Sequence, residues 1–491
     1  MKNNLLVLSL LTLSSTSFAT SATDRQQHLS GGASTVNRIH ASAYSAHSAN
    51  IKDVKGILKF NGGNKFFEEP WAQSVGSVSS QDGLGPLFNN NACQDCHVRD
   101  GRGHSPEAAN NQQGTDFSTM LLRASKSDIS KAEQTAMSLG LQANVGDSCI
   151  GGQLQHQANF GITKEASQAV SYRYQQATFA DGETVELREP IWHVQGINCE
   201  IDDDTVLSAR VAPPMIGLGL LALIETQDII NQEDINDSNN DGISGKANKV
   251  WSVATEEVML GRFGWKAGQP TLGQQSAGAF LGDMGLTTAL FPSENCLRHQ
   301  LDCKNSPNGN GDIADPSYQY EVSTKVLDKV TFYTHHLAVP ARRNAYDQQV
   351  LNGQKIFNEI GCQQCHTASY TTGENAEFPE LSNQKIYPYS DMLLHDMGES
   401  LTDFDKHSNS VDGTIPVEFL ALANEWRTPP LWGIGLAQTV DPKATFLHDG
   451  RARSILEALL WHGGEAQHSK QQLLTLSKKQ RIELLAFLED L

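Results

Sequence analysis

The chain has 491 residues, and its 56 acidic against 37 basic residues leave a formal net charge of −19 at pH 7. This charge argues against nucleic acid or an anionic membrane surface as a partner, because both repel a strongly acidic protein. Hydrophobic residues make up only 39% of the chain and there are 41 glycines, so long loops between modest helices are expected.

The first 19 residues have the pattern of a secretory signal peptide. Lys2 provides a positive start, an apolar run follows from Leu5 to Leu13, and Ser17-Phe18-Ala19 is typical of a cleavage site. The run is too short to span a bilayer, and no other segment is long and apolar enough. We therefore expect a protein exported to the periplasm without a membrane span. Residues 20–50 are polar and without periodicity, which predicts a leader that is flexible or draped over the surface.

A C-x-x-C-H motif follows at Cys93, Cys96 and His97. A c-type haem needs two thiols at this spacing to bond the porphyrin vinyl groups, and the adjacent imidazole binds the iron. Chance would produce about 0.004 such motifs in a chain of this composition. A zinc site would need a second Cys or His pair nearby, and a redox dithiol would not need the histidine. The motif therefore predicts a covalent haem c.

The segment after this motif is too long for a bare cytochrome fold. About 220 residues separate it from an apolar stripe over residues 326–337, which predicts a helix ended by Pro340. We expect an N-terminal haem domain over residues 51–340 with a loop-rich insertion at about residues 105–320. The stretch "FADGETVELREPIWHV" predicts a β-hairpin around the Asp181-Gly182 turn.

Four cysteines lie outside the haem motifs. An oxidising periplasm favours disulfides between them. The short separation of Cys296 and Cys303 favours that pair and leaves Cys149 with Cys199.

The stretch "DINDSNNDGISGKAN" resembles the start of a calcium-binding loop. Asp237, Asn239 and Asp241 supply side-chain oxygens and Ile243 a carbonyl oxygen. Position twelve is Asn248 rather than the usual bidentate glutamate, which weakens the prediction of Ca²⁺. A plain Asn/Asp/Gly turn is the alternative.

A second C-x-x-C-H motif, formed by Cys362, Cys365 and His366, lies in a predicted C-terminal domain of residues 341–491. Apolar residues at helical spacing predict a helix over residues 350–360, directly before the motif. Ser477 begins a capping box before the last helix, and another helix is expected to begin near Ser454. The predicted fold is therefore mainly α, with two cytochrome-c-like haem domains and short β-hairpins in the insertion.

Several further stretches occur in a recognisable order. "RTPPLWGIG", "FLHDGRARSILEAL" and the two haem motifs resemble the bacterial di-haem cytochrome c peroxidase superfamily. "GPLFNNNACQDCHVRDGRG", "APPMIGLGLL", "DGISGKAN", "LAVPARR" and "DMLLHDMGE" resemble more specifically its di-haem oxidoreductase branch, also described as thiol-oxidoreductase-like. The resemblance extends from about residue 55 to residue 491 and implies two covalent haems.

The resemblance also implies ligands for the C-terminal haem. In the peroxidases a methionine that binds this iron lies fourteen residues after the histidine of the H-D-G motif. Counting from His448 reaches His462, which suggests a bis-histidine iron bound by His366 and His462, with Met397 as the alternative to His462. His448 is expected near the haem edge, and Arg427 and Arg451 are expected to meet the propionates.

The sixth ligand of the N-terminal haem stays open among three residues, His104, Met284 and His156. The glutamate that acts as acid and base in the peroxidases cannot be transferred, because its surrounding motif is not present. Calcium near the domain interface is a further implication of the resemblance.

The function implied is an exported di-haem c-type oxidoreductase that reduces peroxide at the N-terminal haem with electrons passed through the C-terminal haem. Its partners would be a periplasmic electron donor of the small cytochrome or cupredoxin type and a small-molecule oxidant. The alternatives are a non-catalytic electron-transfer cytochrome and a haem protein accessory to iron uptake or thiol oxidation. The sequence leaves monomer and homodimer open.

Overall fold

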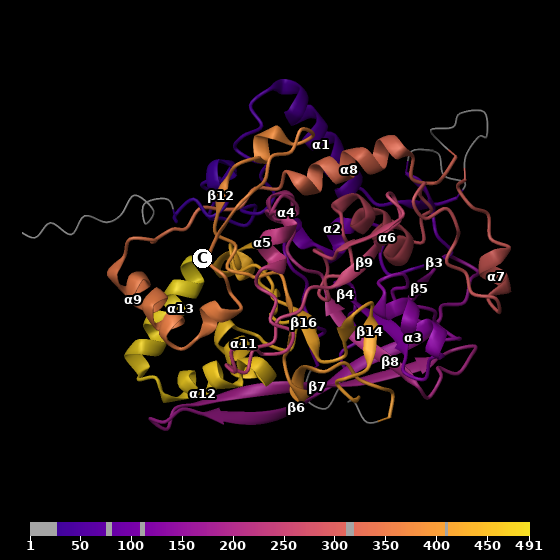
Figure 1. The fold of residues 1–491 in the computed structure, drawn as a ribbon. Helices are drawn as coiled ribbons and strands as arrows, with labels where there is room; N and C mark the ends of the chain where they lie inside the picture. The colour runs from indigo at the N-terminus through magenta and orange to yellow at the C-terminus, as the bar shows by residue number, and fades with distance from the viewer. Residues whose placement is uncertain (1–26, 75–80, 109–112, 311–318, 408–410) are drawn as a thin grey trace, which may run out of the picture.

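The computed structural model describes residues 27–74, 81–108, 113–310, 319–407 and 411–491 (Figure 1). The predicted signal peptide lies outside the described residues. The helices are α1 Val54–Glu68, α2 Cys93–Cys96, α3 Lys131–Ser138, α4 Leu218–Ala222, α5 Thr226–Ile230, α6 Leu272–Met284, α7 Leu301–Lys304, α8 Thr324–His335, α9 Gln348–Glu359, α10 Ala437–Val440, α11 Ile455–Trp461, α12 Gln467–Thr475 and α13 Lys478–Asp490.

The strands form small two-stranded sheets rather than one large sheet. Their bounds are β1 Ala72–Gln73, β2 Asp82–Leu84, β3 Leu87–Phe88, β4 Met120–Lys126, β5 Gln157–Ala158, β6 Ala166–Thr178, β7 Thr184–Gly196, β8 Thr205–Val211, β9 Lys249–Ser252, β10 Glu257–Leu260, β11 Tyr370–Thr371, β12 Lys385–Ile386, β13 Leu394–Asp396, β14 Pro416–Glu418, β15 Ala421–Leu422 and β16 Glu425–Arg427.

The prediction of a mainly α protein is wrong. The structure is 30% helix and 20% strand, which contradicts a pair of mainly helical cytochrome-c-like domains. The physical reason lies in the segment that we interpreted as a loop-rich insertion. Residues 166–196 contain valines, tyrosines, Ile191 and Trp192, whose branched or aromatic side chains favour extended backbone. They form a long antiparallel hairpin with strands of 13 residues each rather than a short one.

The tip of this hairpin contacts the C-terminal helices. The Asp181-Gly182 turn is where the sequence predicts it, and Thr178 pairs with Thr184 on either side. Phe179, which is 2% exposed, packs into the C-terminal core. The guanidinium of Arg481 donates to carboxylates of the turn segment, 2.8 Å from Oδ2 of Asp181. In Figure 1 the hairpin runs along the lower edge, beneath α12.

Helices α1 and α8 pack together over the first haem motif, at the top of Figure 1. The predicted helix over residues 326–337 is confirmed as α8. Gly63 allows the close approach of α1, because a Cβ there would lie 2.2 Å from the carbonyl oxygen of Lys329. Rings of Phe60 and Phe67 lie 4.7 and 5.2 Å from that of Tyr333. This apolar core extends to Cys93 in α2.

The leader is packed where it is described, in contrast to the flexible segment expected over residues 20–50. Val36 bridges to Pro340 and His47 bridges to Leu337. Tyr44 is 1% exposed, and its hydroxyl donates to the carbonyl oxygen of Gly433. Residues 27–50 therefore pack against the segment that follows α8 and against the C-terminal part of the chain.

The predicted C-terminal helices are confirmed as α9, α11 and α13. The side chain of Ser477 accepts from the backbone of Gln480, and the capping box is complete. Ser454 is the N-cap of α11, and His462 is its C-cap. The helices enclose a core that includes Phe357, Leu460 and Phe487.

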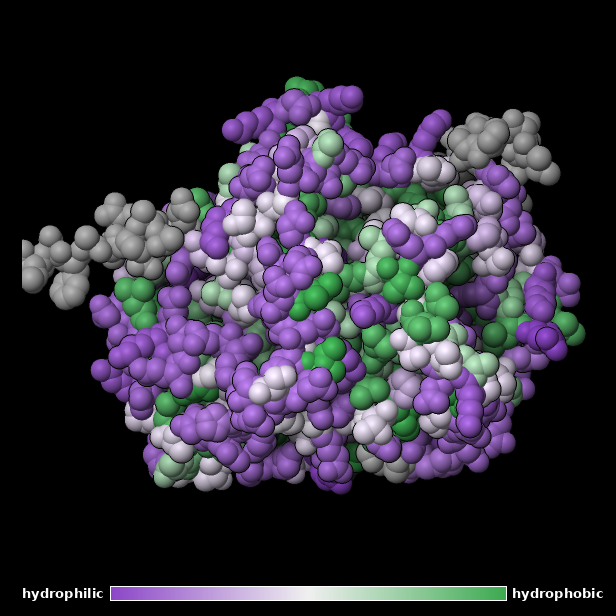
Figure 2. Space-filling view, viewed as in Figure 1, coloured by the Kyte–Doolittle hydropathy of each residue, from purple (hydrophilic) through white to green (hydrophobic). Residues whose placement is uncertain are grey.

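Two disulfides join the cysteines outside the motifs, and they are the pairs that the spacing favours. Cys149 bonds Cys199, and Cys296 bonds Cys303. Hydrophilic residues cover most of the face in Figure 2, with smaller hydrophobic groups between them. Among the described residues, no helix is long and apolar enough to cross a membrane.

Candidate haem sites

The second motif is positioned by α9 and a short turn. Gly361, with φ of 89°, ends the helix in the left-handed region and leads into the turn that begins at Cys362. Nδ1 of His366 lies 2.8 Å from the carbonyl oxygen of Tyr389. This contact places the ring proton on Nδ1 and leaves the lone pair of Nε2 free, as iron ligation requires. Burial lowers the pKa of His366 to about 4, so the ring is neutral at pH 7.

His462 has the same arrangement. Its Nδ1 lies 2.7 Å from the carbonyl oxygen of Ala458, one turn earlier in α11. Burial lowers the pKa of this imidazole as well, so Nε2 again carries a free lone pair.

His366 and His462 line one cavity with both thiols of the motif. The cavity is partly open to solvent. Most of its remaining lining is apolar and includes Phe357, Ile360, Leu401, Leu431, Phe446, Leu459, Leu473 and Leu488. Two thiols, two neutral imidazoles and an apolar wall fit a haem better than a hydrated ion.

The other residues predicted for this haem divide into two groups. Met397, Arg427 and His448 line the cavity. Arg451 lines a neighbouring polar pocket, where its Nη2 lies 2.8 Å from Oδ2 of Asp449. The guanidinium of Arg451 is therefore paired with the carboxylate of Asp449. Arg427 donates to backbone carbonyls of Gly264 and Thr428, at 3.0 and 3.1 Å.

His448 borders both the haem cavity and the neighbouring polar pocket. Its ring stacks on that of Trp426, with centroids 3.5 Å apart. Lys266 approaches the same tryptophan, 3.6 Å from the ring centroid. Burial lowers the pKa of His448 to about 3, so this ring is neutral at pH 7.

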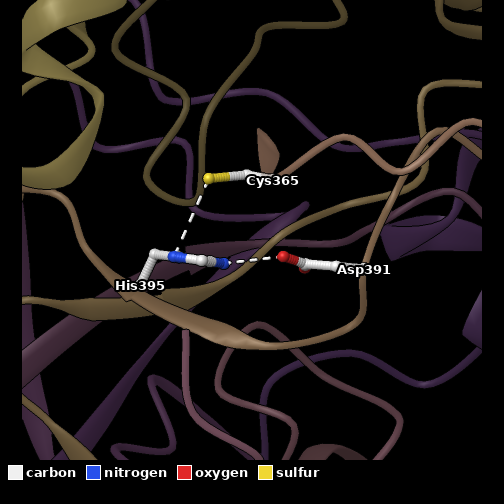
Figure 3. A group of neighbouring side chains, drawn as sticks. All are labelled: Cys365, Asp391 and His395. Atoms are coloured by element: carbon white, nitrogen blue, oxygen red, sulfur yellow. Dashed lines mark hydrogen bonds and ion pairs between the residues drawn. The ribbon is translucent and has the colours of Figure 1, made fainter. Parts of the chain in front are cut away.

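A buried histidine that the sequence analysis did not single out lies beside Cys365 (Figure 3). His395 directs Nδ1 toward Sγ of Cys365, at 3.7 Å, and toward Oε2 of Glu465, at 2.5 Å. Its Nε2 lies 2.8 Å from Oδ2 of Asp391. Burial opposes protonation, but these hydrogen bonds raise the pKa of His395 well above its ordinary value.

Cys365, Asp391 and His395 could in principle hold a metal ion, because their ligand atoms lie within 4.8 Å of one another. The hydrogen bonds argue against it. An imidazole that donates from both nitrogens to carboxylates is an imidazolium, and it has no lone pair for a metal. We therefore interpret this group as a cationic ring held between two carboxylates at the edge of the haem cavity. In the sequence, the local indication of this group is the i, i+4 spacing of Asp391 and His395. Glu465 lies 70 residues after His395, so no local pattern connects it with them.

The first motif repeats the essential geometry of the second. Nδ1 of His97 lies 2.8 Å from the carbonyl oxygen of Pro213, and burial lowers the pKa of His97 to about 4. Cys93 packs against the core of α1, α6 and α8. Nδ2 of Asn90 donates to Sγ of Cys96 at 3.2 Å, and to the carbonyl oxygen of Ser118.

The thiols of both motifs are unsuited to thiol–disulfide chemistry. Burial raises the pKa of Cys96 to about 12 and that of Cys362 to about 12. A reactive redox dithiol needs a lowered pKa, because the thiolate is the nucleophile. The environment of these cysteines therefore favours attachment over redox chemistry.

The three candidates for the sixth ligand of the N-terminal haem have different surroundings. Met284, which is 2% exposed, packs in the same core as Cys93. His104 is 7% exposed, and its Nδ1 lies 3.4 Å from the carbonyl oxygen of Ser105. Nδ1 of His156 lies 2.9 Å from Nδ2 of Asn89. The identity of this ligand stays a prediction.

Two residues that are distant in sequence from the second motif line its cavity. Arg102, five residues after His97, lines the cavity of the second motif, and its Nη1 donates to the carbonyl oxygen of Thr445 at 3.1 Å. Trp265 also lines the cavity, and its ring nitrogen donates to the carbonyl oxygen of Val211 at 2.8 Å. Sequence reasoning missed both residues, because nothing local connects them with the second motif.

The predicted calcium loop is an exposed turn held by its own acidic side chains. Oδ1 of Asp237 accepts from the backbone of Asp241 at 2.9 Å. Oδ2 of Asp241 accepts from Gln364 of the second haem motif, at 3.1 Å. Asn248 is 1% exposed and donates to the carbonyl oxygen of Lys266, so position twelve is directed into the core. Calcium therefore stays a prediction.

Two paired-thiol sites, each with one neutral imidazole on a backbone carbonyl, define the class of protein: an oxidoreductase built around two haem centres. A family model described as "Di-haem oxidoreductase, putative peroxidase" matches residues 25–491, and the chain belongs to this family. The resemblance inferred from the sequence is thereby confirmed. A comparison with curated proteins finds no match.

Proposed function

We propose that the protein is an exported c-type cytochrome that reduces peroxide at its N-terminal haem and receives electrons through its C-terminal haem. The observation that carries the proposal is the apolar cavity that His366 and His462 line together with Cys362 and Cys365. Two protein ligands close an iron to substrates, which suits electron entry rather than catalysis. The N-terminal centre is then the one that binds the oxidant.

The residues that would hold the haems follow from the motifs. The thiols of each motif would bond the vinyl groups, and His97 and His366 would each bind one iron. His462 would be the second protein ligand of the C-terminal iron, with Met397 as the alternative. When bound, the haems supply the one-electron chemistry that reduction of peroxide to water requires.

The surrounding protein tunes these centres. The carbonyl oxygens of Pro213 and Tyr389 accept from Nδ1 of the two motif histidines, which fixes each ring and raises the basicity of Nε2. The apolar lining of the C-terminal cavity limits access of water. Of the two arginines predicted to meet the propionates, Arg427 is the one that lines this cavity.

The partners in this proposal are a periplasmic donor of the small cytochrome or cupredoxin type and a small-molecule oxidant. The acidic net charge of −19 favours a donor with a basic or neutral contact surface. Bound Ca²⁺ at Asp237, Asn239, Asp241 and Ile243 belongs to the same proposal.

The test is spectroscopic and uses the purified, haem-loaded protein. Haem staining and intact mass should show two covalent haems per chain. Electron paramagnetic resonance of the oxidised and half-reduced protein should show one low-spin centre and one centre that becomes high-spin. Peroxide should be turned over with a chemical electron donor.

Each rival function has a distinct result. A purely low-spin protein that neither binds cyanide nor turns over peroxide would be an electron-transfer cytochrome. Oxidation of added thiols without peroxide turnover would favour the accessory role in thiol chemistry.

A further inference from the structure

A chain of side-chain hydrogen bonds lies beside the first haem motif and ends at His156. It begins at Asp283, in α6. Nε2 of Gln153 lies 2.7 Å from Oδ1 of Asp283 and 2.9 Å from the carbonyl oxygen of Gly282. Both of these atoms accept hydrogen bonds, so they fix the amide of Gln153 with its nitrogen on this side.

The orientation of the Asn89 amide follows from the groups around it. Nε2 of Gln153, which has two protons for three nearby acceptors, also lies 2.7 Å from Oδ1 of Asn89. The carbonyl oxygen of Leu154 can only accept, so the atom of the Asn89 amide that faces it is the donor Nδ2. Nδ2 donates to the carbonyl oxygen of Leu154 at 2.8 Å and to Nδ1 of His156 at 2.9 Å. A ring nitrogen that accepts a hydrogen bond carries no proton. Neutral His156 therefore has its proton on Nε2.

This tautomer is the opposite of the one at the predicted iron ligands. His97, His366 and His462 each direct Nδ1 to a backbone carbonyl, which leaves a lone pair on Nε2. A contact between Nδ1 and a backbone carbonyl oxygen does not by itself identify an iron ligand, because Nδ1 of His335 makes the same contact with Thr331 within α8. It does argue against His156 as a ligand, since iron would have to replace the proton on Nε2 and break the contact with Asn89.

His156 lies close to the edge of the first motif. Asn89 precedes Asn90, whose Nδ2 lies 3.2 Å from Sγ of Cys96. On the other side, the ring of His156 lies 6.4 Å from that of Phe117, the neighbour of Ser118. The carbonyl oxygen of Ser118 is 3.4 Å from the same sulfur. Among the described residues, Nε2 of His156 has no hydrogen-bond partner.

We propose that His156 donates a hydrogen bond from Nε2 to a small oxygen-containing ligand at the N-terminal haem, and that Asn89, Gln153 and Asp283 hold it in the donating tautomer. This inference rests on the function proposed above. A fixed donor aimed at a peroxide oxygen stabilises the negative charge that develops as the O–O bond is reduced. His156 is the residue that touches the ligand, and Asn89 is a positioning residue.

The experiment compares four variants of the full-length, haem-loaded protein. His156→Leu removes the donor, and His156→Gln replaces it with an amide donor. Asn89→Asp retains His156 but offers its Nδ1 only an acceptor, which should reverse the tautomer. His193→Leu is the matched control, since its imidazole is exposed on the hairpin and bonds Oγ of Ser171 there, at 2.9 Å.

The expected result separates a donor from a ligand. His156→Leu and Asn89→Asp should slow the reaction with peroxide about 100-fold and weaken fluoride binding at the iron about 10-fold. His156→Gln should recover most of both losses, and His193→Leu should change neither. Haem content and spin state should match the wild type in all four. Asn89→Asp should unfold at a lower temperature, because it places a carboxylate oxygen against the carbonyl oxygen of Leu154.

Three outcomes would overturn the proposal. A change of spin state in His156→Leu would make His156 an iron ligand. Unchanged peroxide rate and fluoride affinity in that variant would remove its role. A wild-type protein that binds neither fluoride nor cyanide would have no open iron face for a donor to serve.

A failure of the peroxidase function itself gives a different result. Wild-type protein with two haems would then not turn over peroxide, while the effect of His156→Leu on fluoride binding would still report the donor.

Discussion

His366 and His462 line one apolar cavity, and each directs Nδ1 to a backbone carbonyl oxygen, at 2.8 and 2.7 Å. The two imidazoles belong to separate elements, one to the turn after α9 and the other to the end of α11. Both are neutral at pH 7 because burial lowers their pKa. This relationship supports the bis-histidine ligation that the family resemblance predicts for the C-terminal haem.

His462→Ala should convert the C-terminal iron from low-spin to high-spin, because it removes one of two strong-field ligands. The measurement is electron paramagnetic resonance of the oxidised protein. Met397→Leu is the control, since Met397 lines the same cavity. If His462→Ala stayed low-spin and Met397→Leu did not, Met397 would be the ligand.

Cys362→Ala should lower the haem content of the chain toward one, and Cys93→Ala should act in the same way on the other motif. Each change removes one of the two thiols that anchor a macrocycle. Haem staining and intact mass report the result. Replacing both Cys296 and Cys303, which form a disulfide outside the motifs, should leave two haems. Full retention of covalent haem in both motif variants would refute the attachment sites.

His395→Gln should lower the midpoint potential of the C-terminal haem by tens of millivolts, on the order expected for one charge a few ångströms from the site. The change removes a cation that lies 3.7 Å from Sγ of Cys365 and leaves Asp391 and Glu465 uncompensated. Glu465→Gln removes an anion from the same group and should shift the potential upward. Spectroelectrochemical titration measures both shifts. Shifts of the same sign in the two variants would contradict the charge assignment.

The free energy of unfolding should fall as the pH rises toward 8, because the carboxyl group of Glu165 is buried. Burial raises the pKa of its carboxyl group to about 8, although hydrogen bonds from Gln155 and Gln300 oppose the shift. The folded state therefore retains a proton that the unfolded state loses above its ordinary pKa. Stability from this group is present at low pH and lost as pH rises, with a slope of at most about 1.4 kcal/mol per pH unit.

Glu165→Gln should remove this dependence. The check is the free energy of unfolding of both proteins in denaturant between pH 5 and 8. Parallel curves for variant and wild type would show that the carboxyl group titrates with an ordinary pKa.

The helices were predictable because their signals are local. Apolar spacing located α8, a serine located the start of α11, and a capping box located the start of α13, each within a few residues. The strands were mostly missed. In the long hairpin the Asp181-Gly182 turn and the alternating residues beside it provided the signal. The full length of the strands was missed, because many positions of β6 and β7 are partly exposed on both faces and do not alternate strictly.

The sequence by itself contains the whole prediction of haem attachment, since two thiols and an imidazole must lie within five residues to serve one haem. It also determined the two disulfide pairs, which follow from spacing. The tertiary structure alone decided which groups surround those haems. His395 meets Glu465, Arg102 reaches the second cavity, and Asn89 sets the tautomer of His156, each across 65 residues or more. Such contacts depend on packing between distant segments, and no local pattern of residues records them.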